Sequence, residues 1–290
     1  MKQDIGRQVL PLAAVLFAVG GLWIAIAWRR GRLDGRAIAL AYAMEIVVLA
    51  VIFVPAYLGA GWMAAAVVIL AGVCTWELYA VLDRAGAMPY RVLGVCAACA
   101  TILATAGLGL AGALAVAAVA CLALVGRTRR RALATATGVV YPGLCLAHLL
   151  ALSAGDGGFG NVVFCYGLVE VNDSIAYLAG RSIGGSKLWP EVSPNKTVAG
   201  SVVGLAGTVA LAPVFRFAVP GLTAAQALAA AALLAVGGQV GDLVASRFKR
   251  KAGVKDYGSL VPAHGGVLDV YDSLIFVAPL CYYYLALCRR

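Results

Sequence analysis

The sequence predicts an all-α polytopic membrane protein of about ten transmembrane helices, with a polar site in its C-terminal half that faces the cytoplasm. Hydrophobic residues make up 63% of the 290 positions, charged residues make up 12%, and the mean hydropathy is +0.93. Soluble domains are roughly half apolar and a quarter charged, so a water-soluble fold could not bury this much apolar surface. Two further patterns, basic residues in alternate loops and acidic residues after residue 160, predict the orientation and the site.

The transmembrane helices are predicted from the length of the apolar segments. A span needs roughly 20 mostly apolar residues, because the hydrocarbon core is about 30 Å thick and a helix rises about 1.5 Å per residue. The first candidate resembles a secretory signal, but it is too long and ends in Trp28-Arg29-Arg30 without a small-residue cleavage site, so we interpret it as a span. The predicted spans are 9–28, 37–58, 62–82, 92–108, 110–126, 132–153, 161–180, 197–219, 224–244 and 261–287.

The distribution of Lys and Arg predicts the orientation. Of the 23 basic residues, 18 lie in the loops that follow the first, third, fifth, seventh and ninth predicted spans. By the positive-inside rule these loops are cytoplasmic and both termini lie outside. The net charge of +10 is then explained by topology and by attraction to anionic membrane lipids, and it does not indicate a nucleic-acid partner. We expect an integral protein of the bacterial inner membrane with its active site on the cytoplasmic side.

The chain divides into three predicted parts. Residues 1–36 form an additional N-terminal span with a basic loop, residues 37–155 form membrane scaffold helices rich in Ala, Leu, Val and Gly, and residues 156–290 form the catalytic membrane helices and loops. The glycines in 107–112 are not followed by Lys-Ser/Thr, so they predict a turn between two spans and not a phosphate loop.

Acidic residues near the ends of the last spans predict a functional site. Asp173, Asp242, Asp269 and Asp272 fall within or beside apolar segments. An ionised Asp at the bilayer centre costs about 2.5–3.5 kcal/mol on insertion scales, so such residues usually face a cavity, a partner or an ion. Their clustering at one face of the bilayer therefore indicates a site.

The segment 241–273 joins two acidic helix ends through a basic loop. Asp242 and Ser246 are four residues apart and Asp269 and Asp272 are three apart, so each pair shares a helical face. Carboxylates hold Mg²⁺, the metal bridges phosphate oxygens, and Lys and Arg neutralise a leaving pyrophosphate. The pattern therefore suits a nucleoside triphosphate with magnesium.

The residues of this loop resemble a known signature. The stretch from Ser246 contains S-R-F-K-R, then K-D, then L-V-P-x-H-G-G-x-L-D-x-x-D-S, which ends at Ser273. It is similar to the signature of the phosphatidate cytidylyltransferases, the CDP-diacylglycerol synthases. Further blocks at 172–197 and at Thr75-Trp76-Glu77 also match, and the resemblance covers roughly residues 37–290.

The resemblance implies a reaction and a set of site residues. CTP and phosphatidate, or a related lipid phosphate, would give the CDP-lipid and pyrophosphate, with Mg²⁺ as cofactor and a second cation as an open alternative. Membrane lipids and a second copy of the chain in a homodimer are the other expected partners. The expected metal ligands are Asp242 and Asp269; the catalytic residues are Lys255, Asp256, His264 and Asp272; the substrate-binding residues are Asp173, Lys196, Lys249, Arg250, Gly265 and Gly266.

One departure from the family pattern keeps alternatives open. The family usually has Arg after the first Asp of its closing D-R-x-D, and this chain has Val270. Val cannot replace a bidentate guanidinium, so reduced activity, an altered lipid substrate and an inactive family member remain alternatives. Two further alternatives are a CTP-dependent polyprenol kinase and a transporter. A transporter would be expected to carry polar residues in two repeat halves, whereas here they lie in one half of the chain.

Several other polar residues are predicted to be structural. We interpret Glu45 and Glu77 as isolated, with Glu77 and Trp76 anchoring the membrane interface. We expect Glu77→Gln to affect turnover much less than replacement of Asp242 or Asp269 by Asn. His148 is expected to bond between helices. Cys96 and Cys99 are expected to pack in a span and not to form a redox or zinc site.

Overall fold

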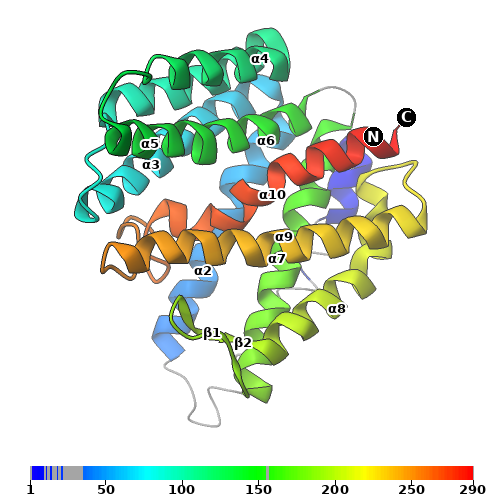
Figure 1. The fold of residues 1–290 in the computed structure, drawn as a ribbon. Helices are drawn as coiled ribbons and strands as arrows, with labels where there is room; N and C mark the ends of the chain where they lie inside the picture. The colour runs from blue at the N-terminus through cyan, green and yellow to red at the C-terminus, as the bar shows by residue number, and fades with distance from the viewer. Residues whose placement is uncertain are drawn as a thin grey trace.

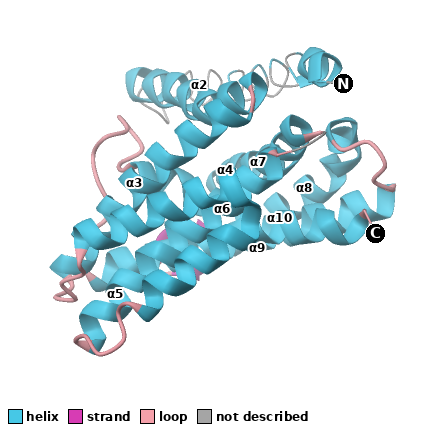
Figure 2. Ribbon diagram, turned by 90° about the horizontal axis from the view of Figure 1, so that it is seen from above, coloured by secondary structure: helices cyan, strands magenta, loops and turns pink. Residues whose placement is uncertain are grey.

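The computed structural model describes residues 2–9, 35–154 and 157–289, together with the single positions 11, 14, 18 and 21. Long helices packed side by side dominate this part of the chain, and the described strands form one short hairpin (Figures 1 and 2). The predicted span 9–28 lies largely outside the described residues. The rest is a helical, polytopic architecture as the sequence predicted, except that the short hairpin within residues 187–197 was not predicted.

The described elements follow the chain in a simple order. They are α2 (Gly35–Leu58), α3 (Ala60–Arg84), α4 (Arg91–Leu122), α5 (Arg129–Gly138), the π-helix η1 (Val139–Leu144), α6 (Cys145–Ser153), α7 (Gly158–Ile183), β1 (Lys187–Trp189), β2 (Ser193–Thr197), α8 (Val198–Phe215), the 3₁₀ turn η2 (Arg216–Ala218), α9 (Ala224–Lys251) and α10 (Val267–Cys288).

Seven helical segments of the described chain are long and apolar enough to cross a membrane. They are α3, α4, the continuous run from α5 to α6, α7, α8 with η2, α9 and α10. In α2 the described apolar stretch is the shorter Ala43–Leu58. The predicted count of ten spans is therefore not confirmed: the first lies largely outside the described residues, the second is short, and two others fall within the single element α4.

Element α4 reverses its direction at Gly109. This residue has φ 69° and ψ −171°, a backbone conformation outside the helical region that glycine adopts without a Cβ penalty. Beyond the turn the chain returns to where it started, since the guanidinium of Arg127 lies 5.0 Å from the ring centroid of Tyr90. The predicted turn between two apolar segments is thus confirmed. The returning arm, Leu110–Leu122, rises only about 20 Å, which is less than the hydrocarbon thickness.

Close helix packing in the N-terminal half depends on one aromatic ring. Tyr79 of α3 is fully buried, and its hydroxyl donates to the carbonyl of Thr135 at 2.6 Å. A Cβ added to Gly94 would lie 1.9 Å from the Tyr79 hydroxyl oxygen, and one added to Gly138 would lie 2.4 Å from it. The ring therefore fills the space that two glycines leave between α3, α4 and α5.

Glycines also bring α7 and α8 together in the C-terminal half. A Cβ on Gly200 would lie 2.6 Å from the carbonyl oxygen of Ala176, and one on Gly204 would lie 2.8 Å from the Cβ of the same alanine. Such small residues let helix backbones approach in a membrane. Helix α8 begins where the side chain of Thr197 accepts a hydrogen bond from the Gly200 amide at 3.0 Å. Lys196, the residue before this cap, belongs to β2, which contacts α7.

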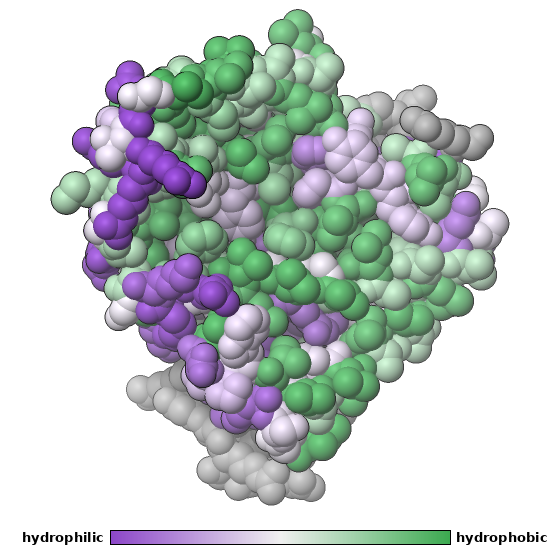
Figure 3. All heavy atoms as spheres, viewed as in Figure 1, coloured by the Kyte–Doolittle hydropathy of each residue, from purple (hydrophilic) through white to green (hydrophobic). Residues whose placement is uncertain are grey.

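The two ends of the bundle differ in polarity. Hydrophilic side chains collect on the left of Figure 3, over the loops that follow α3, the returning arm of α4 and α9. The described N-terminal segment and the end of α10 lie on the other side (Figure 1), where the side chain of Arg289 donates to Asn161 at 2.6 Å. The described basic loops after α3, α4 and α9 thus lie on one side, opposite the described parts of both termini.

Candidate functional site

The polar site lies where α9 ends and α10 begins, and a buried ion pair joins the two helices. Lys249 Nζ lies 2.6 Å from Asp269 Oδ1, with side-chain exposures of 9% and 5%. The aromatic ring of Tyr257 covers the ammonium, 5.3 Å from the ring centroid. Removing one partner of a buried ion pair leaves an uncompensated charge that costs about 3–5 kcal/mol, so each residue depends on the other.

The second oxygen of Asp269 ties down the loop between the helices. Oδ2 accepts hydrogen bonds from the backbone amides of Tyr257 at 2.6 Å and Gly266 at 2.8 Å. Gly265 has φ 107°, and a Cβ there would lie 3.0 Å from this oxygen. The sequence analysis assigned Gly265 and Gly266 to substrate binding, and that role stays a prediction. In the described structure the Gly266 amide binds the chain's own Asp269.

Glu77 of α3 caps the first turn of α10, so the prediction that it only anchors the interface is wrong. Its carboxylate accepts from the backbone amides of Val267 at 3.1 Å and Leu268 at 2.8 Å, and the residue is 5% exposed. The first amides of a helix lack partners within the helix and favour a negative charge. A carboxylate from the predicted scaffold half therefore supports the helix that carries Asp269.

A second ion pair lies farther along α9. Lys196, at the end of β2, forms an ion pair with Asp242 Oδ2, and Ser246 donates to Asp242 Oδ1 at 3.0 Å. The predicted shared face of Asp242 and Ser246 is confirmed. Burial lowers the pKa of Lys196, but the carboxylates of Asp242 and Asp173 raise it by more. The net shift is upward, so the ammonium is charged at neutral pH.

Two more carboxylates surround this lysine. Asp173 of α7 accepts from the Asn172 side chain at 2.9 Å and lies within electrostatic reach of Lys196 and Asp242. Asp272 of α10 is 4% exposed and interacts with Asp242 and with both lysines. The described residues of α7, β2, α9 and α10 therefore form one group of four carboxylates and two ammonium groups.

An amide network fixes the spacing of α7, α8 and α9 beside these charges. Gln239 of α9 donates from its side-chain nitrogen to Asn172 Oδ1 and to the carbonyl of Ser201, both at 3.1 Å. Asn172 is fully buried. Because the neighbouring residue of Asn172 is Asp173, the network also holds that carboxylate in place.

Four predicted site residues lie at the edge of this cluster. Arg250 donates to the carbonyl oxygens of Val192 and Val254, both at 3.1 Å, and so ties the β1–β2 turn to the loop after α9. Lys255 and Asp256 are exposed in that loop. His264 lies 3.7 Å from Glu45 of α2, so the interpretation of Glu45 as isolated is wrong. The assignment of catalytic and substrate-binding roles to these four residues stays a prediction.

Val270, which stands where the family usually has arginine, lies beside the cluster. Val270 occupies the first turn of α10, is partly buried and packs against the apolar core. Its neighbour Tyr271 donates to the carbonyl of Val48 at 2.8 Å. A valine is thus compatible with the packing found here, and its consequence for activity stays a prediction.

The remaining polar residues named from the sequence have structural contacts. His148 Nδ1 lies 2.8 Å from the Leu144 carbonyl oxygen, and Nε2 lies 3.3 Å from the Tyr283 hydroxyl, which confirms the expected helix–helix role. Cys96 and Cys99 are free thiols within α4. Among the residues that the structure describes, no three His, Cys, Asp or Glu side chains are arranged to hold one metal ion.

Fold and site together define a polytopic helical membrane protein whose acidic and basic side chains neutralise one another at one end of the bundle. Comparison with known proteins identifies the family. The chain matches the model of the cytidylyltransferase family over residues 39–288 and belongs to that family.

Curated relatives agree with this assignment over part of their length. A phosphatidate cytidylyltransferase of Bacillus subtilis (strain 168) is 40% identical over 151 residues, which are 51% of this chain and 56% of that protein. One of Brucella abortus biovar 1 (strain 9-941) is 43% identical over 156 residues, 52% of this chain and 57% of that protein. The uncharacterized protein YnbB of Escherichia coli (strain K12) is 42% identical over 133 residues, 46% of this chain and 45% of that protein. The matches thus span about half the length of these relatives.

Proposed function

We propose that this protein transfers a cytidylyl group from CTP to phosphatidate and produces CDP-diacylglycerol and pyrophosphate. The observation that carries the proposal is the pairing of Lys196 with Asp242 and of Lys249 with Asp269 at one end of the bundle. The names of the curated relatives, the phosphatidate cytidylyltransferases, support the choice of substrates.

The two lysines would leave their aspartate partners and bind the phosphates when the nucleotide binds. In the described structure each ammonium neutralises a carboxylate of the chain. A triphosphate carries more negative charge than one carboxylate, so it attracts an ammonium group more strongly at the same distance. Lys196 and Lys249 would therefore turn to the phosphates and leave Asp242 and Asp269 available for a cation.

The donor set fits Mg²⁺ chemically. Mg²⁺ prefers oxygen ligands and usually binds through one or two carboxylates together with substrate phosphates. Asp242 and Asp269 supply such carboxylates, with Asp173 and Asp272 beside Asp242. When bound, the ion would neutralise charge on the phosphates during the transfer.

The reaction needs no nucleophile from the protein. A phosphate oxygen of phosphatidate would attack the α-phosphorus of CTP, the bond to the β-phosphate oxygen would break, and pyrophosphate would leave. Positioning and charge neutralisation are then the main catalytic contributions. Lys196 and Lys249 would hold the leaving phosphates, and the capped N-terminus of α10 would keep Asp269 in place.

We further propose that the reaction takes place at the cytoplasmic face of the bacterial inner membrane. The proposal rests on the side of the bundle that carries the basic loops. A homodimer is also proposed, and size determination in detergent would test it.

Two preparations of CTP, each labelled at a different phosphate, test the proposed transfer and distinguish it from a kinase reaction. Purified protein is incubated with phosphatidate, Mg²⁺ and CTP labelled either at the α- or at the γ-phosphate, and the lipid extract is counted. We expect the α-label in the lipid, with loss of transfer in Asp242→Asn and normal transfer in the exposed control Glu191→Gln. Transfer of the γ-label would instead identify a CTP-dependent lipid kinase. Absence of both labels with folded protein would show that phosphatidate is not the substrate and would refute the proposal.

A further inference from the structure

A hollow of about 680 Å³ lies away from the site, between the start of α4 and the start of α5. Its lining combines two arginines, one aspartate, a tyrosine and apolar side chains. The lining residues are Asp83, Met88, Pro89, Tyr90, Arg91, Val92, Leu93 and Arg131. We propose that this hollow binds the headgroup of an anionic glycerophospholipid.

Positive charge dominates the hollow. The guanidinium groups of Arg127 and Arg131 lie 5.0 and 4.2 Å from the ring centroid of Tyr90. Arg131 Nε also donates to the Met88 carbonyl at 2.8 Å, which fixes the side chain at the rim. Arg91 is neutralised by Asp83, to which its Nε donates at 2.6 Å.

The arginines in and beside the α4–α5 connection are not neutralised by a carboxylate of the described chain. Within the described ranges, no carboxylate pairs with Arg127, Arg129, Arg130 or Arg131. Their excess charge would be complemented by a phosphate group. Arginine suits this role because its planar donors match phosphate oxygens.

Apolar side chains at the hollow favour a lipid over a soluble anion. Met88, Val92 and Leu93 are 62%, 71% and 44% exposed, and the last two lie in the first turn of the membrane-spanning helix α4. Trp76, which is 49% exposed, lies under the guanidinium of Arg91 at 5.3 Å. Tryptophan is enriched at the headgroup level of membranes, so the arginines lie at that level and the apolar residues beside the acyl chains.

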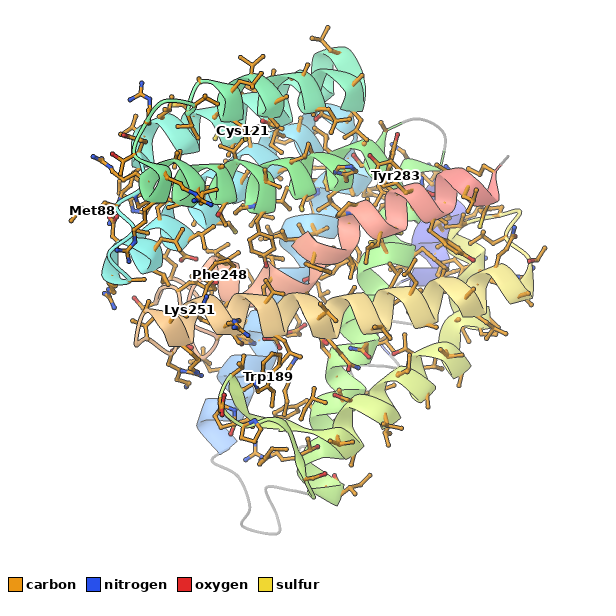
Figure 4. The ribbon with its side chains drawn as sticks, viewed as in Figure 1. Met88, Cys121, Trp189, Phe248, Lys251 and Tyr283 are labelled. Atoms are coloured by element: carbon orange, nitrogen blue, oxygen red, sulfur yellow. The ribbon has the colours of Figure 1, made fainter. Side chains whose placement is uncertain are left out.

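The hollow is separate from the catalytic cluster. Its lining comes from the end of α3, the α3–α4 connection, α4 and α5, whereas the cluster lies on α7, β2, α9 and α10. In Figure 4, Met88 lies at the outer edge of the bundle, apart from Lys251 at the end of α9 and from Trp189 on β1. Binding at the hollow therefore does not depend on the proposed transferase activity.

Lipid titration of the full-length protein tests the proposal. Detergent-purified protein is titrated with phosphatidylglycerol or phosphatidylcholine, and bound lipid is counted by native mass spectrometry. We expect tight binding of phosphatidylglycerol alone. The double variant Arg127→Gln/Arg131→Gln should bind it roughly thirtyfold more weakly, since each surface arginine contributes about fivefold.

Matched variants identify the cause of any loss. Lys251→Gln removes one exposed charge at another loop on the same side, and it should keep full binding. Arg127→Lys/Arg131→Lys keeps both charges but loses the planar donors, so its affinity should lie between those of the wild type and the Gln variant. A melting temperature of the Gln variant equal to that of the wild type would exclude misfolding as the cause of its loss. Equal retention by the wild type and the Gln variant would overturn the proposal. So would equal binding of phosphatidylcholine, or displacement of the lipid by millimolar glycerol 3-phosphate, which would indicate a site for soluble anions.

Discussion

Replacing Glu77 by Gln should destabilise the protein, a consequence that the sequence alone did not indicate. The carboxylate accepts two backbone amides of α10, from Val267 and Leu268. A glutamine side chain has one oxygen and one NH₂ group, so one amide would lose its acceptor and face a donor. An unsatisfied buried donor costs about 1–3 kcal/mol.

The lost charge adds to this cost. A carboxylate at a partly buried helix N-terminus contributes up to about 2 kcal/mol. Together the two effects give a loss on the order of 2–4 kcal/mol in the free energy of unfolding. For a chain of this size the apparent melting temperature would fall by roughly 4–16 °C.

Thermal unfolding in detergent measures this effect. Glu77→Gln is compared with the wild type and with Glu191→Gln, which removes an exposed carboxylate from the β1–β2 turn. CTP-dependent activity should fall with stability, since α10 carries Asp269. If Glu77→Gln melts within a degree of Glu191→Gln, the cap does not stabilise α10 and this reasoning is refuted.

Three further outcomes are expected. Asp242→Asn and Asp269→Asn should each abolish turnover while the protein still inserts, as followed by membrane fractionation; activity near wild type in both would place the metal elsewhere. Val270→Arg should raise the rate with phosphatidate roughly ten- to a hundredfold, because a charge-assisted contact contributes about 1.5–3 kcal/mol; an unchanged rate would show that Val270 is not limiting. In a cysteine-free background, Cys placed at Ser259 should resist an impermeant thiol reagent applied to intact cells, and ready labelling would contradict a cytoplasmic loop.

Apolar segment length predicted most of the helices, and spacing predicted several contacts. Asp242 and Ser246 bond to each other because residues four apart share a helical face, a relation that the sequence displays directly. The turn at Gly109 was likewise visible in the sequence as a glycine-rich break between apolar runs. These features depend on neighbours along the chain.

Contacts between distant elements could not be predicted in the same way. Glu77 lies 190 residues from Val267 in the sequence, and no periodicity connects an acidic residue of α3 to the start of α10. Its place within the block Thr75-Trp76-Glu77, which resembles the family pattern, was the available signal. The pairing of Asp269 with Lys249 was not predicted either, because the sequence analysis assigned the aspartate to a metal and the lysine to a substrate.

Because Tyr79 packs against Gly94 and Gly138, a substitution at one of these three positions requires a substitution at another. Gly94 and Gly138 leave space only for hydrogen at the places that the tyrosine ring occupies. An alanine at either position would have to be accompanied by a smaller residue at 79, and a smaller residue at 79 would leave a cavity unless one glycine gained a side chain. Homologues that differ here should therefore change these positions together, and a library that varies them one at a time would recover few folded proteins.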